Sequence, residues 1–287
     1  MPNAASSPHD RADLRIAALA HHALIDELET WPKPGLVSPV DSGSHRDMDA
    51  RTLTRSAGAI APFFADLVRA GAVWAPLPEL RRIGLLAEAA MLAATGGVNA
   101  HRGAIFSLGL IAAAAGRAGD AAMSAEDRAE HVGALWGAEI ARVPVSPVSH
   151  GGKAARRYGV GGAAAEAAAG FPAVRALGLP ALRRGRRLAP DDAQAARVEC
   201  LFALMADLDD TNVLHRGGAE GLRFAQRSAR DFLDAGGVGA GDWRDRALAL
   251  HRAFVADRLS PGGSADLLAV TLFLDSLAAP DPGFPKG

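Results

Sequence analysis

The stretch LRIAALAHHALIDEL, residues 14–28, shows the pattern that decides the fold of this 287-residue chain. Its apolar residues Leu14, Ala17, Leu24 and Leu28 are separated by three, seven and four residues, which places them on one face of an amphipathic helix. Similar periodicity predicts further helices over residues 53–68, 80–94, 101–116, 124–142, 161–169, 191–214, 218–235, 243–258 and 264–278. Together these segments predict a bundle of about ten helices.

Strand patterns are almost absent from the sequence. The nearest one, ARVPVSPV (141–148), is interrupted by Pro144 and Pro147, which cannot donate the hydrogen bonds of a central strand. No repeat, low-complexity linker or shift in composition divides the chain. We therefore predict an all-α fold, with a disordered N-terminus over residues 1–10 and a single globular helical domain over residues 11–280.

The composition argues against several classes of protein. Hydrophobic residues make up 49% of the chain and aromatic residues 5%, so a sizeable core of alanine, leucine and valine is available. The 31 basic and 32 acidic residues leave a net charge of −1, which gives no field that would favour nucleic acid. The longest apolar run, IFSLGLIAAAAG (105–116), is shorter than the roughly 20 residues that span a bilayer. We expect a soluble protein with neither a nucleic-acid nor a membrane partner.

The N-terminus and the cysteine content bear on the compartment. Residues 1–15, MPNAASSPHDRADLR, contain no apolar segment of the kind found in signal peptides. The single cysteine, Cys200, cannot form an internal disulfide and favours a reducing environment. We therefore expect the protein in the cytoplasm.

The segment KPGLVSPVDSGSHRDMD (33–49) interrupts the helical periodicity with a dense run of polar side chains. It follows the period of neither a helix nor a strand, and it contains two prolines and two glycines. A polar loop of this length is either a disordered linker or a site held by a rigid scaffold. The other polar clusters of the chain favour the second interpretation.

The segment LMADLDDTNVLHRGG (204–218) carries the strongest functional signal. The apolar face of its predicted helix continues from Met205 to Asp209 and then to Asn212, so a carboxylate and an amide extend a buried face. Burying such groups is unfavourable unless a cation or hydrogen-bond donors compensate. The alternative is that Asp209 and Asp210 merely end the helix, but acids are unfavourable near a helix C-terminus. We therefore predict that Asp209 and Asn212 point inward and have a functional role.

Two helix starts allow two interpretations each. In GGVNAHRG (96–103), the backbone N–H groups that open the next helix suit an anion, or Asn99 simply caps that helix. Asp266 is explained by its place in a first helical turn after the N-cap Ser264, where a negative charge suits the helix dipole. Asp266 also lies on the line of the buried face of the same helix, so an inward orientation stays open.

The remaining polar clusters are weaker signals. Glu88 and Glu166 are each typical of surface carboxylates on alanine-rich helices. SHGGKAARRYG (149–159) is typical of a solvated, basic helix end. The arginine run LRRGRRL (182–188) lacks aromatic residues between its charges, so we predict an exposed turn and no nucleic-acid contact.

The side chains in these clusters favour a hard cation. Aspartate, glutamate and asparagine oxygens recur, whereas the HExxH and CxxC patterns of zinc sites are missing. Mg²⁺ takes one or two carboxylates, keeps several waters and binds substrate phosphates. Basic residues near the Gly-rich turns could hold such phosphates, although the sequence has no GxxxxGK[ST] phosphate loop.

Six segments, in their order along the chain, resemble the triphosphoribosyl-dephospho-coenzyme A synthase family. They are KPGLVSPVDSGSHRDMD, GGVNAHRGAIFSLG, SHGGKAARRYG, EAAAGFP, MADLDDTNVLHRGG and SPGGSADLLA. The resemblance runs from about residue 14 to residue 278 and implies an all-helical fold. One departure is Ala100, where the family usually has threonine, which puts any contact of that hydroxyl with a phosphate or a metal-bound water in doubt. Arg102 stands where lysine is common and keeps the charge.

The resemblance implies a transferase that joins ATP and 3′-dephospho-CoA. Its products would be adenine and 2′-(5″-triphosphoribosyl)-3′-dephospho-CoA, which would pass to a transferase acting on an acyl carrier protein. The short spacing and the arginine of AHRG (100–103) are more similar to the malonate decarboxylase branch of the family than to the citrate lyase branch. A β-linked substrate and an α-linked product imply inversion, most simply through one displacement with an oxocarbenium-like transition state.

The polar clusters supply residues for each part of this reaction, and together they would form a central nucleotide pocket in a catalytic domain. The catalytic residues are predicted among Asp209, Asp210, Asp49 and His45. Mg²⁺ is the expected cofactor, with ligands among Asp47, Asp49, Glu88, Asp209 and Asp210. The nucleotide and its phosphates are predicted to contact Lys33, Ser44, Asn99, His101, Arg102, Asn212, Arg216 and Asp266. The sequence does not separate the general base from the metal ligands.

Two other functions use the same residues. A metal-dependent, all-helical hydrolase that splits a nucleotide or ADP-ribosyl bond would activate water in place of a ribose hydroxyl. A non-catalytic module that binds CoA derivatives or a carrier protein would need basic and apolar surface but no inward acids, which the predicted placement of Asp209 and Asn212 argues against. The sequence also leaves open whether the chain forms a homodimer.

Overall fold

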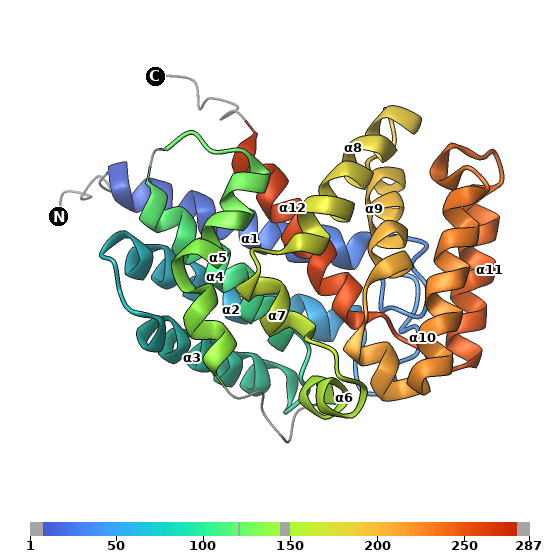
Figure 1. Cartoon of the computed structure of the whole chain (residues 1–287), viewed down its shortest axis with the longest axis horizontal. Helices are drawn as coiled ribbons and strands as arrows, with labels where there is room; N and C mark the ends of the chain where they lie inside the picture. The colour runs from blue at the N-terminus through green and yellow to red at the C-terminus, as the bar shows by residue number, and fades with distance from the viewer. Residues whose placement is uncertain (1–7, 120, 144–149, 280–287) are drawn as a thin grey trace.

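Helices rich in alanine and leucine make up nearly all of the structure (Figure 1). The computed structural model describes residues 8–119, 121–143 and 150–279, and these residues form no strand. Their α-helices are α1 (Pro8–Glu29), α2 (Ala50–Ala72), α3 (Leu77–Thr95), α4 (Arg102–Ala118), α5 (Ala125–Arg142), α6 (His150–Tyr158), α7 (Gly162–Ala168), α8 (Leu179–Leu188), α9 (Ala193–Asp207), α10 (Thr211–Asp234), α11 (Trp243–Ala256) and α12 (Gly262–Ala278). The π-helical turn η1 (Val174–Gly178) leads into α8, and the 3-10 turn η2 (Gly237–Gly239) precedes α11. The all-α prediction is confirmed, and the described residues contain twelve α-helices where about ten were predicted.

Two of the additional helices, α6 and α8, lie in segments without a helical apolar period. The arginine run 182–188 was predicted to be an exposed turn and instead belongs to α8. Its arginines pair with carboxylates of neighbouring helices, and these pairs are Arg183–Glu126, Arg184–Glu199 and Arg186–Asp275 at 2.6, 2.9 and 2.6 Å. The turn prediction was wrong because these partners are distant in sequence and leave no local pattern.

The helix predicted over residues 191–214 is two helices. α9 ends at Asp207, Leu208 has extended backbone angles (φ −70°, ψ 133°), and Asp210 is the N-cap of α10. The apolar period runs through this break because Leu208 packs against the core from a non-helical position. α10 therefore begins before the predicted start at residue 218, and Gly218 forms a kink inside it (φ 62°, ψ −162°).

Helix α12 occupies the centre of the protein. Figure 1 shows it passing between α1 to α5 on one side and α8 to α11 on the other, and it contacts α1, α4, α5, α9 and α10. Leu268, Val270, Phe273 and Leu274 are each fully buried, so the helix has almost no polar face. A helix of this kind is stable only when other elements enclose it.

Glycines let α2 and α4 approach each other backbone to backbone. A Cβ on Gly71 would lie 1.9 Å from the carbonyl oxygen of Ala113, and one on Gly116 would lie 2.0 Å from that of Val68. This contact fixes α4 against α2 and sets where the first turn of α4, with its polar residues, begins.

Two smaller predictions concern the N-terminus and the membrane. Residues 1–7 of the predicted disordered segment lie outside the described residues, whereas residues 8–10 form the start of α1. Within the described part of the chain, no helix combines the length and the apolar character that crossing a membrane requires.

We expect Gly71→Ala to lower the free energy of unfolding by about 1–3 kcal/mol or more, because the added methyl would meet backbone that cannot rotate away. Gly58→Ala is the matched control, since Gly58 lies in the same helix with nothing within 4 Å of a Cβ. That substitution should raise the stability by roughly 0.5–1 kcal/mol. Urea unfolding of both variants measures the difference. Equal effects of the two substitutions would contradict a close α2–α4 contact.

Candidate functional site

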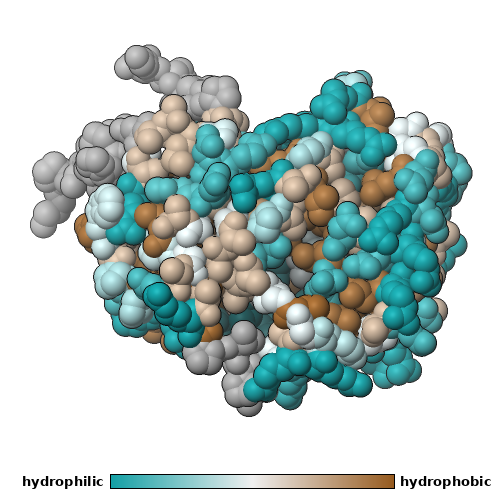
Figure 2. All heavy atoms as spheres, in the orientation of Figure 1, coloured by the Kyte–Doolittle hydropathy of each residue, from teal (hydrophilic) through white to brown (hydrophobic). Residues whose placement is uncertain are grey.

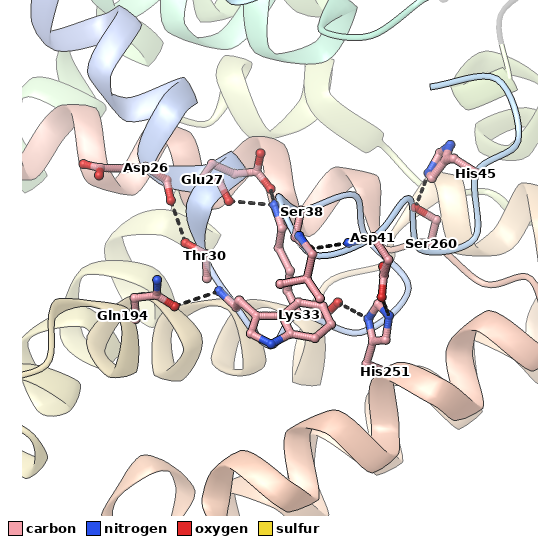
Figure 3. A network of polar contacts seen from close by, with 12 residues as sticks. Asp26, Glu27, Thr30, Lys33, Ser38, Asp41, His45, Gln194, His251 and Ser260 are labelled. Atoms are coloured by element: carbon pink, nitrogen blue, oxygen red, sulfur yellow. Dashed lines mark hydrogen bonds and ion pairs between the residues drawn. The ribbon is translucent and has the colours of Figure 1, made fainter. Parts of the chain in front are cut away.

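The polar loop between α1 and α2 is anchored by a buried ion pair. Nζ of Lys33 donates to the backbone oxygen and to Oε1 of Glu27, both at 2.6 Å, and only 1% of the Lys33 side chain is exposed (Figure 3). Burial lowers the pKa of Lys33, and the Glu27 carboxylate opposes that shift. The ammonium group of Lys33 is enclosed, so it would influence a bound phosphate through its charge. Its predicted contact with a phosphate stays a prediction.

The rest of the loop is held against α11 and the segment that follows it. The backbone oxygen of Lys33 accepts from Nδ1 of His251 at 2.8 Å, and Nε2 of the same ring lies 3.1 Å from Oδ2 of Asp41 (Figure 3). Oγ of Ser44 donates to the backbone oxygen of Leu259 at 2.5 Å. The loop is therefore an ordered wall of the protein and not a linker.

His45 and Arg216 meet at the outer end of this loop. Nε2 of His45 lies 2.9 Å from Oγ of Ser260, and a guanidinium nitrogen of Arg216 lies 3.2 Å from Nδ1 of His45. Burial, and then the positive charge of Arg216, lower the pKa of His45. A neutral ring that accepts from Arg216 and donates to Ser260 satisfies both contacts. Asp47 is mostly exposed beside them, 3.6 Å from His45 Nδ1.

Asp210 joins the N-termini of two helices. Its Oδ1 accepts from the backbone N–H groups of Asn212 and Val213 at 2.9 and 3.3 Å, at the start of α10. Its Oδ2 accepts from the backbone N–H and the hydroxyl of Ser264 at 2.8 and 3.0 Å, in the first turn of α12. Burial raises the pKa of the Asp210 carboxyl, and these hydrogen bonds oppose the shift.

The predicted orientation of the two neighbouring aspartates is reversed. Asp209, predicted to point inward, is exposed, and Asp210, which lay off the predicted buried line, is 3% exposed. The prediction was wrong because it continued one helix through both residues, whereas the chain is extended there and turns Asp210 toward the core. Asn212 is partly exposed in the first turn of α10.

Asp266 links the start of α12 to the start of α4. A Cβ on Gly103 would lie 2.0 Å from Oδ2 of Asp266, so the carboxyl rests directly on the backbone of the first turn of α4. The side chain stays partly exposed. Burial, and then the negative charges of Glu27 and Asp210, raise the pKa of Asp266 well above its usual range, and a hydrogen bond from the Ala104 backbone opposes the shift.

His101 lies immediately before α4 and is nearly buried, at 6% exposed. Its Nδ1 lies 2.7 Å from Oγ of Ser56 in α2. Its Nε2 has no hydrogen-bond partner among the described residues, although it is buried. Burial and the charge of Lys33 lower the pKa of His101 to about 4, so the ring is neutral at neutral pH. A buried ring nitrogen without a partner is suited to a hydrogen bond with a bound molecule.

The N-termini of α4, α10 and α12 therefore meet around two aspartates. Such termini carry partial positive charge and N–H groups that suit an anion. Asn99 is exposed and does not cap α4, because the N-cap is His101, whose side chain makes no capping bond. The interpretation of Asn99 as an ordinary cap was therefore wrong.

The other predicted acids are not gathered into one cluster. Asp49 is exposed and caps α2 through Thr52, and Glu88 pairs with Arg102 at 2.8 Å. Across the described residues, no group of three or more histidine, cysteine, aspartate or glutamate side chains could hold a metal ion. The five predicted acids thus form no all-protein metal cage there, and a Mg²⁺ ion bound by fewer carboxylates together with substrate phosphates stays a prediction.

A cavity of about 220 Å³ adjoins this site at the connection between α9 and α10. Its lining combines apolar and acidic side chains, and the lining residues are Gly161, Gly162, Ala165, Glu166, Ala173, Leu177, Asp207, Leu208 and Asp209. Figure 2 shows a hollow near the middle of this face, bordered by both hydrophilic and apolar residues. Glu166 was predicted to be a surface carboxylate and is instead half-buried in α7, with Oε2 accepting from the backbone N–H of Ala173 at 3.1 Å.

Four polar residues of the site were missed from the sequence: Glu27, Ser56, His251 and Ser260. Each lies in or beside a helix where a single polar residue is unremarkable, and the partners of Ser56, His251 and Ser260 are distant along the chain. Only Glu27 had an indirect signal in the sequence. It stands next to Leu28, and both residues lie on the buried face of the same helix.

Comparison with known proteins identifies close relatives. The sequence model described as CitG, ATP:dephospho-CoA triphosphoribosyl transferase, matches residues 13–283. A protein of Azotobacter vinelandii named probable 2-(5''-triphosphoribosyl)-3'-dephosphocoenzyme-A synthase is 45% identical over 99% of this chain and 98% of its own length. Proteins with the same name from Stutzerimonas stutzeri and Pseudomonas fluorescens Pf-5 are 46% and 44% identical over 92% and 96% of this chain, and over 91% and 95% of their own lengths. No solved structure matches the chain.

We expect protonation of His101 to destabilise the fold as the pH falls from about 6.5 toward 4, the ordinary and the folded pKa of this ring. Over that range the unfolded chain binds a proton that the folded chain does not, so this group lowers the free energy of unfolding by about 1.4 kcal/mol per pH unit. Above pH 6.5, the full contribution of His101 to the free energy of unfolding is present. Urea unfolding at pH 7 and pH 5 measures the change. His101→Gln should show a smaller change than the wild type, and an unchanged slope would contradict a buried neutral ring.

Proposed function

The chain belongs to the ATP:dephospho-CoA triphosphoribosyl transferase family, and from that membership we propose that it converts ATP and 3′-dephospho-CoA to 2′-(5″-triphosphoribosyl)-3′-dephospho-CoA and adenine. The structural observation that carries this proposal is the meeting of the α4, α10 and α12 N-termini at Asp210 and Asp266. That arrangement places carboxyl groups suited to acid–base chemistry beside the partial positive charge of three helix N-termini.

The reaction exchanges one bond at the anomeric carbon of the ATP ribose. The bond from C1′ to the adenine nitrogen breaks, and a bond from C1′ to the 2′-oxygen of dephospho-CoA forms. The triphosphate stays on the transferred ribose, so the site must hold it without cleaving it. Inversion at C1′ is consistent with a single displacement, in which the attacking hydroxyl loses its proton to a base.

Asp266 is the base in this mechanism, in place of the Asp209 and Asp210 predicted from the sequence. All four hydrogen bonds of Asp210 come from the starts of α10 and α12, which supports a structural role for this residue. The Asp266 carboxyl is partly exposed, and its burial, followed by the neighbouring negative charges, raises its pKa. A carboxylate with a raised pKa is the stronger proton acceptor.

The triphosphate binds at the first turn of α4. One N–H group of this turn, that of Ala104, is bonded to Asp266, and the unpartnered Nε2 of His101 beside it is placed to contact a bound oxygen. Arg102 contributes positive charge at the same helix start, where its guanidinium is 43% exposed and paired with Glu88.

Mg²⁺ is the cofactor in this proposal and would neutralise charge on the triphosphate. The residues fit an ion that binds one or two carboxylates and completes its coordination with substrate oxygens. Asp47 would hold it, because its carboxylate is exposed and lies near Arg216 of α10. Asp49 is less suited, since its carboxylate already accepts from Thr52.

The product is passed to a transferase that acts on an acyl carrier protein, and malonate decarboxylase is preferred over citrate lyase as the enzyme served. The spacing and the arginine of AHRG (100–103) support that preference. The mass of the prosthetic group on each carrier protein, in cells with and without this chain, distinguishes the two destinations. An unchanged malonate decarboxylase carrier would contradict the preference.

The proposed reaction is tested by incubating the chain with ATP, dephospho-CoA and Mg²⁺ and following the products by mass spectrometry. We expect free adenine and the triphosphoribosyl adduct in equal amounts, and neither product when Mg²⁺ is chelated. Adenine release without dephospho-CoA would instead identify a hydrolase. Dephospho-CoA binding without any adenine release would identify a binding module.

Asp266→Asn should lower kcat by roughly 10²–10⁴-fold if the carboxylate is the general base. The substitution keeps the shape of the side chain but removes the proton acceptor, so circular dichroism and Tm should change little. Asp257→Asn, an exposed position just after α11, is the control and should keep the wild-type rate. A wild-type kcat for Asp266→Asn at saturating substrates would remove Asp266 from this role.

A further inference from the structure

The cavity between α7, η1 and the end of α9 has no role in the mechanism described so far. Its volume of about 220 Å³ is below the roughly 300–1,000 Å³ of pockets that enclose a whole drug-sized ligand. A flat heterocycle fits such a space, whereas a complete nucleotide does not. Because Asp209 lines the cavity and Asp210 is the next residue, the cavity and the aspartate site share the α9–α10 connection.

The walls of this cavity differ from one side to the other. Ala165, Leu177 and Leu208 supply apolar surface, and Gly161 and Gly162 leave backbone without side chains. The polar part of the lining comes from the carboxyl groups of Glu166, Asp207 and Asp209. Apolar faces suit an aromatic ring, and carboxyl groups suit amino groups and ring nitrogens at its edge. This combination matches a purine base and does not match a phosphate, which carboxylates would repel.

Glu166 differs from the other two acids in its surroundings. Asp207 pairs with Arg230 at 2.9 Å and is 56% exposed, and Asp209 is exposed. Glu166 is half-buried, and only its Oε2 has a hydrogen bond among the described contacts, from the Ala173 backbone. Burial raises the pKa of the Glu166 carboxyl, against the Ala173 hydrogen bond and the charge of Arg175. Of the three acids, Glu166 is the one suited to carry a proton.

Resting on the proposed function, we propose that this cavity receives the adenine of ATP and that Glu166 is a catalytic residue, which donates a proton to a ring nitrogen of the leaving base. As the bond from C1′ to the base breaks, its electron pair goes to the purine ring. The Glu166 proton neutralises the developing charge, and adenine leaves as the neutral base. The proton from the attacking 2′-hydroxyl goes to Asp266, so one proton enters the protein for each one that leaves.

This assignment gives complementary roles to Asp266 and Glu166, the two carboxyl groups that combine a raised pKa with partial exposure. Asp266 removes a proton from the incoming hydroxyl, and Glu166 supplies one to the outgoing base. A pair of carboxyl groups that act as base and acid is the usual solution for displacement at an anomeric carbon with inversion. The three residues 208–210 join the two halves of the site.

The proton transfer is tested by steady-state kinetics of Glu166→Gln in the complete chain. We expect kcat to fall by roughly 10²–10⁴-fold with little change in the KM for dephospho-CoA, and the limb of the pH profile that requires a protonated acid to disappear. Glu166→Asp should recover part of the rate. Glu130→Gln is the matched control, since Glu130 also lies near Arg175 but is 67% exposed and outside the cavity.

The occupant of the cavity is tested separately with adenine as the probe. Calorimetry should show adenine binding to the wild type and at least tenfold weaker binding to Ala165→Leu, whose larger side chain fills the cavity. Circular dichroism confirms that each variant folds. Wild-type adenine binding by Ala165→Leu, or a wild-type kcat and pH profile for Glu166→Gln, would overturn the inference. If the wild type itself releases no adenine from ATP, the proposed function fails; if it does and the Glu166 variants match it, only the inference fails.

Discussion

The hydrogen bonds of the Asp210 carboxylate determine how the site is built. Four donors from the starts of α10 and α12 converge on its two oxygens, so two helix N-termini are satisfied by one buried charge. Because α12 runs through the middle of the protein, this junction fixes the direction of the central helix as well as that of α10. The positions of Ser264 and Asp266 follow from it.

Charge is the second constraint on this region. Glu27 lies close enough to influence the pKa of both Lys33 and Asp266, and the Lys33–Glu27 ion pair is enclosed. Removing water from charged groups is costly unless partners replace it, and for this ion pair the partners come from α1 and the polar loop. As a result, His101 is neutral beside the buried cation Lys33, and the carboxyl group of Asp266 holds its proton more tightly than usual. Both properties depend on the surroundings and not on the residue types.

The sequence was sufficient for the parts of the fold that local patterns determine. Apolar periodicity located α1 to α5, α7, α11 and α12 because each has apolar residues at helical spacing. The same reasoning failed at Leu208, which keeps the period of α9 while leaving the helix, and the error exchanged the roles of Asp209 and Asp210. It also failed for α8, whose arginines depend on distant carboxylates. Lys33 and Glu166 could not be placed, because burial of a polar residue depends on partners that a single sequence does not reveal.

Gly103 illustrates how the site limits substitution. The carboxyl oxygen of Asp266 occupies the space that a β-carbon would need at residue 103, so any side chain there would push the acid away from the start of α4. If Asp266 is the base proposed above, a larger residue at position 103 lowers the rate by moving this carboxyl, although Gly103 has no functional group of its own. The absence of a side chain at residue 103 would then be a requirement of the proposed reaction.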